Sequence, residues 1–221
     1  KLGRMNTQES FIDQINKVKR RPVSKKVIHR AKLALLDYIG VTLAGYSEQR
    51  TKVDKLIRSL GDEIGRIYPV GISAPMGMNS AVFLNGLNGH ALDFDDGTNA
   101  GIIHLGSPIF SVLLALAQKY NFSGDKLLEA AVIGYETSFT MARSIQPVHK
   151  QLGYHATATC GLLGIAMASS MVLGFNKDKT KQAISTAALS ATGTLKVLED
   201  GSELKPYNVG KTALLGLVAV Q

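Results

Sequence analysis

The sequence predicts an all-α protein with a multi-helix, bundle-like architecture, and two patterns carry this prediction. Apolar residues recur at steps of three to four along most of the chain, which is the spacing of one helix face. Small residues are abundant, with 22 glycines in the chain, and they let helices approach closely. The one candidate for an extended segment, 64–73, is interrupted by Pro69 and Gly71. We expect a single all-helical domain over residues 5–221 and treat residues 1–4 as a possible cloning remnant.

The individual helices follow from this apolar spacing and from residues that cap or end helices. Ser24 is a good N-cap for a long helix, which we expect to end near Gly45. Ser107 and Pro108 together suit the start of another helix, and Ser123 suits the start of the next one. The expected helices are 11–18, 24–45, 50–59, 79–92, 107–120, 123–143, 155–174, 178–191 and 208–221.

The composition narrows the class of protein. The net charge is +8, and most of the excess lies in the first sixty residues, where no aromatic residues interleave to form a base-stacking surface. We therefore expect solvated basic helix faces and no nucleic-acid partner. The single cysteine, Cys160, excludes an internal disulfide. There is no apolar signal-peptide region, and the longest apolar run, Cys160 to Gly174, is short for a membrane span. We expect a cytoplasmic protein without a membrane partner.

The stretch GHALDFDDGTNAGIIHLGSP, residues 89–108, concentrates three carboxylates in a basic chain: Asp93, Asp95 and Asp96. Three interpretations are open. The acids could end a helix and shape a turn, contribute to a substrate site, or bind a metal ion. The loop lacks the alternating ligands of a calcium loop, and no His/Cys pairing has transition-metal spacing, so we expect no metal.

Cationic side chains stand at several predicted helix starts, where the unpaired N–H groups attract anions. His104 precedes one such start, His155 opens another, and Lys205 and Lys211 flank a third. Histidine suits proton removal next to a carboxylate, and lysine stabilises the resulting anion. No phosphate loop, dinucleotide fingerprint or nucleophile elbow is present, which favours acid–base chemistry without a cofactor. Hydroxyl groups near these helix starts belong to Ser107, Thr157 and Thr159, and we expect these three residues and Lys211 to bind substrate.

Five segments in order, NGLNGHALDFDD, IIHLGSP, FSGDKLLEAAVIGYE, GYHATATCGLLGIAMA and LKPYNVGKTALLG, resemble the MmgE/PrpD family. The family includes 2-methylcitrate dehydratase, cis-aconitate decarboxylase and iminodisuccinate epimerase. The resemblance implies a large helical domain, a homodimer, and metal-free chemistry on di- or tricarboxylates. It also implies a smaller α/β lid, which we expect to be absent from this chain and supplied by a missing or separate segment.

The matching positions suggest roles for particular residues. The resemblance implies that His104 and His155 are an acid–base pair, that Lys205 anchors a substrate carboxylate, and that Asp93 orients a histidine or shares a proton. It also implies a role for Thr98 in substrate binding. The function it suggests is a cofactor-independent lyase of the 2-methylcitrate dehydratase type, which eliminates water from a tricarboxylate. A decarboxylase or epimerase of the same family, or a non-catalytic helical dimer without the lid, are the alternatives.

Overall fold

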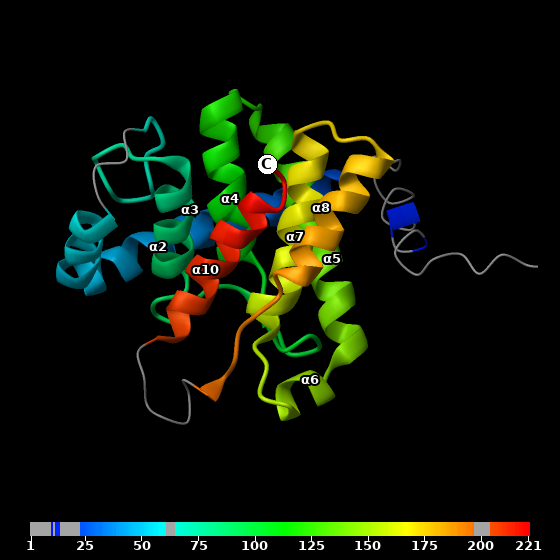
Figure 1. Cartoon of the computed structure of the whole chain (residues 1–221). Coiled ribbons are helices and arrows are strands. Elements are labelled where there is room, and N and C mark those ends of the chain that lie inside the picture. The colour runs from blue at the N-terminus through cyan, green and yellow to red at the C-terminus, as the bar shows by residue number, and fades with distance from the viewer. Residues whose placement is uncertain (1–9, 11, 14–22, 61–64, 197–203) are drawn as a thin grey trace, which may run out of the picture.

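The computed structural model describes residues 10, 12–13, 23–60, 65–196 and 204–221, and this part of the chain is all-α, as predicted (Figure 1). The helices are α2 (Lys25–Leu60), α3 (Met78–Gly89), α4 (Gly106–Tyr120), α5 (Gly124–Ile145), α6 (Val148–Gln151), α7 (Ala156–Val172), α8 (Lys177–Leu189) and α10 (Lys205–Val218). Two short antiparallel strands, β1 (Gly97–Thr98) and β2 (Ile103–His104), pair Gly97 with His104. None of the described helices is long and apolar enough to cross a membrane.

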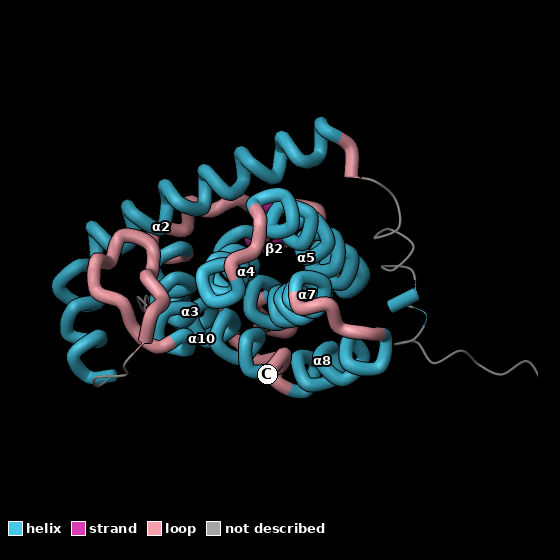
Figure 2. The backbone as a smooth tube through the Cα atoms, turned by 90° about the horizontal axis from the view of Figure 1, so that it is seen from above, coloured by secondary structure: helices cyan, strands magenta, loops and turns pink. Residues whose placement is uncertain are grey.

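Helix α7 is the centre of the bundle. Seen from above, it lies among α4, α5, α8 and α10, while α2 runs across one side of the bundle (Figure 2). Its sequence, ATATCGLLGIAMASSMV, is apolar or small on every face, and nearly all of its residues are buried. A helix that is apolar all round is suited to the core rather than to the surface.

Small residues allow α7 to cross α5 at very short range. A Cβ placed on Gly164 would lie 2.0 Å from Ser138 Oγ and 2.6 Å from the carbonyl oxygen of Gly134, both on α5. A similar approach joins α3 to α10, since a Cβ on Gly86 would lie 2.8 Å from the carbonyl oxygen of Val209. The abundance of small residues in the sequence therefore has a structural cause, because these helices pack backbone against backbone.

We expect Gly164→Ala to destabilise the protein by about 1–3 kcal/mol, because the added methyl group forces two packed helices apart. Gly40→Ala is the matched control. Gly40 lies in α2. Among the described residues, no atom other than its chain neighbours and the adjacent helix backbone lies within 4 Å of the position that an added methyl group would take, so alanine there should stabilise the helix by about 0.5–1 kcal/mol. Urea unfolding of both variants measures the difference. Equal midpoints would contradict the close crossing of α5 and α7.

Some predicted helix boundaries were wrong. The helix predicted over 24–45 ends later than Gly45: α2 consists of two helical segments that meet at a kink at Gln49, where the backbone angles are non-helical. The predicted break between helices 24–45 and 50–59 is therefore present, but as a kink and not at Gly45. Gly45 instead faces α3, where an added Cβ would lie 2.1 Å from the carbonyl oxygen of Asn88. Gly45 therefore allows α2 and α3 to pack closely, whereas the sequence suggested that it ends a helix. The expected helix 11–18 lies almost wholly outside the described residues.

Two corrections affect the candidate site. Helix α10 begins at Lys205, earlier than the expected start at residue 208, so Lys205 is its first residue and Lys211 lies in the second turn. Helix α4 begins at Gly106, so Ser107 lies within its first turn and is not the N-cap. Of the candidate extended segment 64–73, the described residues 65–73 form no strand, although Ile67 makes an isolated β-bridge with Met76.

Candidate active site

The acidic loop after α3 brings a carboxylate to a lysine that is distant in sequence. Asp93 has a φ of 55°, in the left-handed region that residues other than glycine rarely adopt. Its Oδ1 accepts a hydrogen bond of 2.5 Å from Lys205 Nζ. Because Lys205 is the first residue of α10, the acidic loop and the start of α10 form two sides of one charged cluster.

Two histidines flank Asp93, and a buried carboxylate orients both rings. His104 Nε2 lies 3.3 Å from Asp93 Oδ1, and His90 Nε2 lies 3.8 Å from it. On the other side of each ring, His90 Nδ1 donates to Asp95 Oδ1 at 2.8 Å. His104 Nδ1 lies 3.2 Å from the same oxygen and donates to the Asp95 carbonyl oxygen at 2.9 Å. A carboxylate that accepts from Nδ1 fixes the tautomer and the orientation of the ring, so Asp95 positions both histidines.

The charges of the cluster set the protonation of its members. Burial would raise the pKa of Asp95, but hydrogen bonds and positive charge from His104 and His90 outweigh it and hold the pKa well below its usual range. Burial also opposes the charged form of His104, but the hydrogen bond and charge of Asp95 outweigh it and raise the pKa. For Asp93, burial is outweighed by the hydrogen bond and charge of Lys205, and the pKa is lowered. Both carboxylates are therefore ionised, and His104 retains its proton to a higher pH than a free histidine.

His155 has the opposite protonation behaviour. It is the N-cap of α7, only 5% exposed, and its ring centroid lies 5.5 Å from that of His90. Burial, followed by the positive charges of His90, Lys205 and His104, lowers its pKa to about 3. His155 is neutral near physiological pH. Two histidines whose environments push their pKa values apart, His104 upward and His155 downward, are suited to act as proton donor and proton acceptor.

Three members of the cluster, His104, His155 and Lys205, line a cavity of about 230 Å³. Its charged or titratable lining includes His104, His155, Lys150 and Lys205, and none of the described lining residues is acidic. The first residues of α7 also line it and add the partial positive charge of a helix N-terminus. The cavity therefore favours a small anion.

The structure brings most of the sequence-predicted site residues together. The cavity lining includes Thr98, His104, His155, Thr157 and Lys205, and Asp93 is bonded to the last of these. Thr157 also fixes the backbone before α4, because its Oγ1 accepts a hydrogen bond of 3.0 Å from the His104 amide.

Three predicted substrate-binding residues lie elsewhere. Ser107 is fully buried in the first turn of α4. The Thr159 hydroxyl is 2.8 Å from His149 Nε2. Lys211 lies over the ring of Tyr207, and burial lowers its pKa. None of the three belongs to the cavity lining.

Sequence reasoning gave no role to His90, did not single out Asp95 among the three acids, and missed cavity-lining residues on and around α6. His90 could have been found from its position directly before the acidic loop, since it ends α3 as the C-cap. Nothing in the spacing of DFDD indicates which acid faces a histidine. The α6 region contributes Gln146, Lys150 and Tyr154 to the cavity, from the stretch between the predicted helices 123–143 and 155–174.

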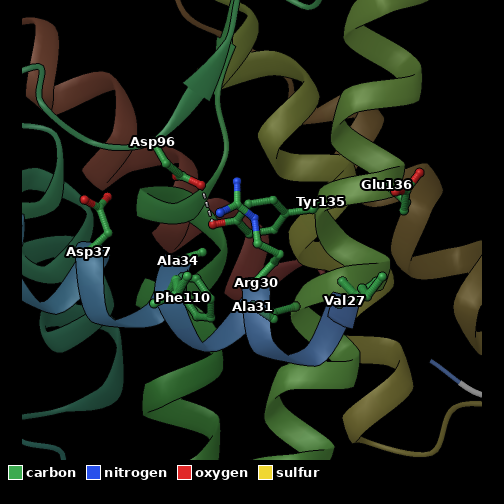
Figure 3. Close-up of a pocket in the computed structure, with 12 residues that line it drawn as sticks. Val27, Arg30, Ala31, Ala34, Asp37, Asp96, Phe110, Tyr135 and Glu136 are labelled. Carbon is green, nitrogen blue, oxygen red and sulfur yellow. Dashed lines mark hydrogen bonds between the residues drawn. The ribbon is translucent and has the colours of Figure 1, made fainter. Parts of the chain in front are cut away.

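A larger cavity of about 550 Å³, between α2, α4 and α5, contains none of the predicted site residues (Figure 3). Asp96 lines this cavity, and each of its two carboxylate oxygens accepts a hydrogen bond. Its Oδ2 accepts from the Tyr135 hydroxyl at 2.9 Å, and its Oδ1 accepts from the Gly106 amide at 2.7 Å. Adjacent acids in one loop therefore differ in role: Asp95 orients the histidines, whereas Asp96 caps α4 and connects it to α5.

The fold and the site define an all-helical domain with a histidine–aspartate–lysine cluster beside a cationic cavity. The chain belongs to the MmgE/PrpD family, whose N-terminal domain model matches residues 9–221. Curated relatives named cis-aconitate decarboxylase are similar to it over most of its length. The protein from Homo sapiens is 29% identical over 96% of this chain and 44% of its own length. The Mus musculus protein is 27% identical over the same shares, and the Aspergillus terreus protein is 23% identical over 89% of this chain and 41% of its own length. The chain thus spans less than half the length of the curated relatives it matches.

Proposed function

We propose that this chain carries the acid–base machinery of a cofactor-independent lyase that acts on a di- or tricarboxylate. The observation that carries the proposal is the pair His104 and His155, with pKa values displaced in opposite directions at one cationic cavity. Lys205 and Lys150 supply positive charge for substrate carboxylates. Proton transfer between these histidines and the substrate needs no electron acceptor or carrier group.

The names of the relatives favour decarboxylation of a cis-aconitate-like tricarboxylate as the specific reaction. When such a carboxylate leaves as CO₂, the electron pair of the broken carbon–carbon bond stays on the substrate. It delocalises through the neighbouring double bond toward a remaining carboxylate, where Lys205 stabilises the negative charge. His104 then donates its Nε2 proton to the carbanion, while Asp95 holds the Nδ1 side of the ring.

Elimination of water from a 2-methylcitrate-like tricarboxylate is the second candidate, and the environment of His155 supports it. This reaction requires a neutral base to remove a proton next to a carboxylate, and the buried His155 is neutral. Its lowered pKa makes it a weak base in the free protein, and the negative charge of a bound tricarboxylate would raise that pKa. His104 would then protonate the departing hydroxide to give water. An epimerase would use the same two histidines on opposite faces of one carbon.

We further propose that the working protein is a cytoplasmic homodimer in which an α/β lid closes the cavity. The family resemblance supports both the dimer and the lid. Closure would exclude water and strengthen the electrostatic interactions around Lys205. A non-catalytic helical dimer that keeps the anion cavity is the alternative, and turnover by the full-length protein distinguishes the two.

The test is a turnover assay of the full-length protein with cis-aconitate, 2-methylcitrate and iminodisuccinate. We expect CO₂ release from cis-aconitate, and a Lys205→Met variant should raise KM by about tenfold or more, because it removes a charge-assisted hydrogen bond to a carboxylate. Lys119→Met, which changes an exposed lysine at the end of α4, is the control and should leave KM unchanged. No turnover of any of the three, together with unchanged citrate binding in His104→Ala and His155→Ala variants, would make the site assignment wrong.

A further inference from the structure

His90 carries a ring nitrogen that the proposed reaction does not use. The His90 side chain is fully buried, and its Nε2 has no hydrogen-bond partner in the part of the chain that the structure describes. A buried polar atom without a partner costs about 1–3 kcal/mol, so such an atom calls for an explanation. Asp93 Oδ1 lies 3.8 Å from it.

The atoms around this nitrogen have the spacing of metal ligands. His90, Asp93, Asp95 and His104 each offer a ligand atom, and these atoms all lie within 4.8 Å of one another. Two ligands of one tetrahedral zinc ion, each at its usual bond length, are about 3.4 Å apart. The observed separations from Asp93 Oδ1 are 3.3 Å to His104 Nε2 and 3.8 Å to His90 Nε2. Both separations are close to this ligand–ligand distance.

Asp95 already supplies the outer contacts that such a site needs. Metal-binding histidines donate the other ring nitrogen to a carboxylate or a carbonyl oxygen, which fixes the tautomer and leaves the binding lone pair free. His90 Nδ1 and His104 Nδ1 both make this contact with Asp95. Two imidazoles and one carboxylate are a ligand set suited to zinc and related divalent transition ions.

We propose that His90, Asp93 and His104 bind a zinc-class divalent metal ion, which competes with the Lys205 ammonium for Asp93 and blocks the acid–base reaction. Lys205 Nζ now occupies the cation position on Asp93 Oδ1. A metal ion there would displace the ammonium and take the His104 Nε2 lone pair, so that His104 could no longer act as the acid. The metal is thus an inhibitor and not a cofactor. Its binding does not depend on the proposed function, although the inhibition does.

The test is calorimetric titration of the purified protein with ZnCl₂, supported by the visible spectrum of bound Co²⁺. We expect one Zn²⁺ per chain and a low-symmetry Co²⁺ spectrum. Asp93→Asn should weaken binding by about tenfold or more, and Asp95→Asn by about 10–100-fold, as for other outer contacts of metal-binding histidines. His29→Gln, which changes an exposed histidine on α2, should leave the affinity unchanged.

The Lys205→Met variant gives the sharpest outcome, because it should bind Zn²⁺ more tightly than the unaltered protein once the competing ammonium is gone. A merely structural role for the cluster predicts no such gain. Unchanged or weaker binding in Lys205→Met, or equal affinity in Asp93→Asn and the unaltered protein, would overturn the proposal. The titration needs no turnover. Tight Zn²⁺ binding in a protein without activity would therefore support the metal site and count against the lyase, whereas turnover that Zn²⁺ does not inhibit would overturn the competition.

Discussion

Replacing His104 by glutamine is expected to lower turnover of the tricarboxylate substrate by about 10²- to 10⁴-fold, the usual contribution of a positioned acid or base. Glutamine keeps a polar group near Asp93 but cannot donate a proton from a cationic ring. Since Lys205 remains in place to bind a carboxylate, the loss should fall on kcat much more than on KM. Steady-state kinetics of the purified full-length variant measures the two parameters separately.

The matched control for this experiment is His29→Gln. His29 is exposed on α2, far in sequence from the cluster, and the same chemical change there should leave kcat unaltered. Thermal unfolding of both variants shows whether folding is preserved. A His104→Gln protein that folds normally and keeps full kcat would remove His104 from the reaction.

Asp95→Asn is expected to reduce kcat by about 10²-fold or more, although Asp95 is nearly inaccessible and does not line the cavity. Both Nδ1 atoms lie near the same carboxylate oxygen of Asp95, and asparagine replaces this charged acceptor by a neutral amide. Both rings therefore lose the negative charge that favours a proton on Nδ1, although His104 keeps its hydrogen bond to the backbone carbonyl oxygen. Asp37→Asn is a control on an exposed acid of α2 and should have little effect on kcat.

The pH profile separates this positioning role from simple damage to the fold. Because His104 must be protonated to act as the acid, activity falls as the pH rises through its raised pKa. Asp95 is a main cause of that raised value, so Asp95→Asn lowers the pKa and moves the alkaline loss of activity to lower pH. His155, with a pKa of about 3, stays neutral throughout this range. An unchanged alkaline limb in Asp95→Asn would contradict the role of Asp95.

The helices could be predicted from sequence because their signals are local. Ser123 illustrates this, since its hydroxyl accepts a hydrogen bond from the Lys126 amide and caps α5 as expected. Gly45 shows the limit of such reasoning. A glycine near the end of an apolar pattern resembles a helix end, but this one is required by the approach of Asn88 from another helix. Such cases are decided by contacts between segments that are distant in the sequence. The spacing of residues within one segment gives no information about those contacts.

The same limit applies to the site. The motif match located Asp93, His104, His155 and Lys205, and the structure places them in one cluster with its cavity. The motif match did not show which of the neighbouring acids faces the histidines. The direction of each side chain in DFDD depends on the positive φ at Asp93 and on the short hairpin that follows.

The most direct test of the account is a crystal structure of the protein with citrate bound as a stable tricarboxylate. The account predicts citrate in the cavity of about 230 Å³, with one carboxylate on Lys205 Nζ and the others within reach of His104 and His155. Citrate that instead occupies the larger cavity beside Arg30 and Tyr135, with the Lys205 cavity free of it at saturating concentration, would contradict the account.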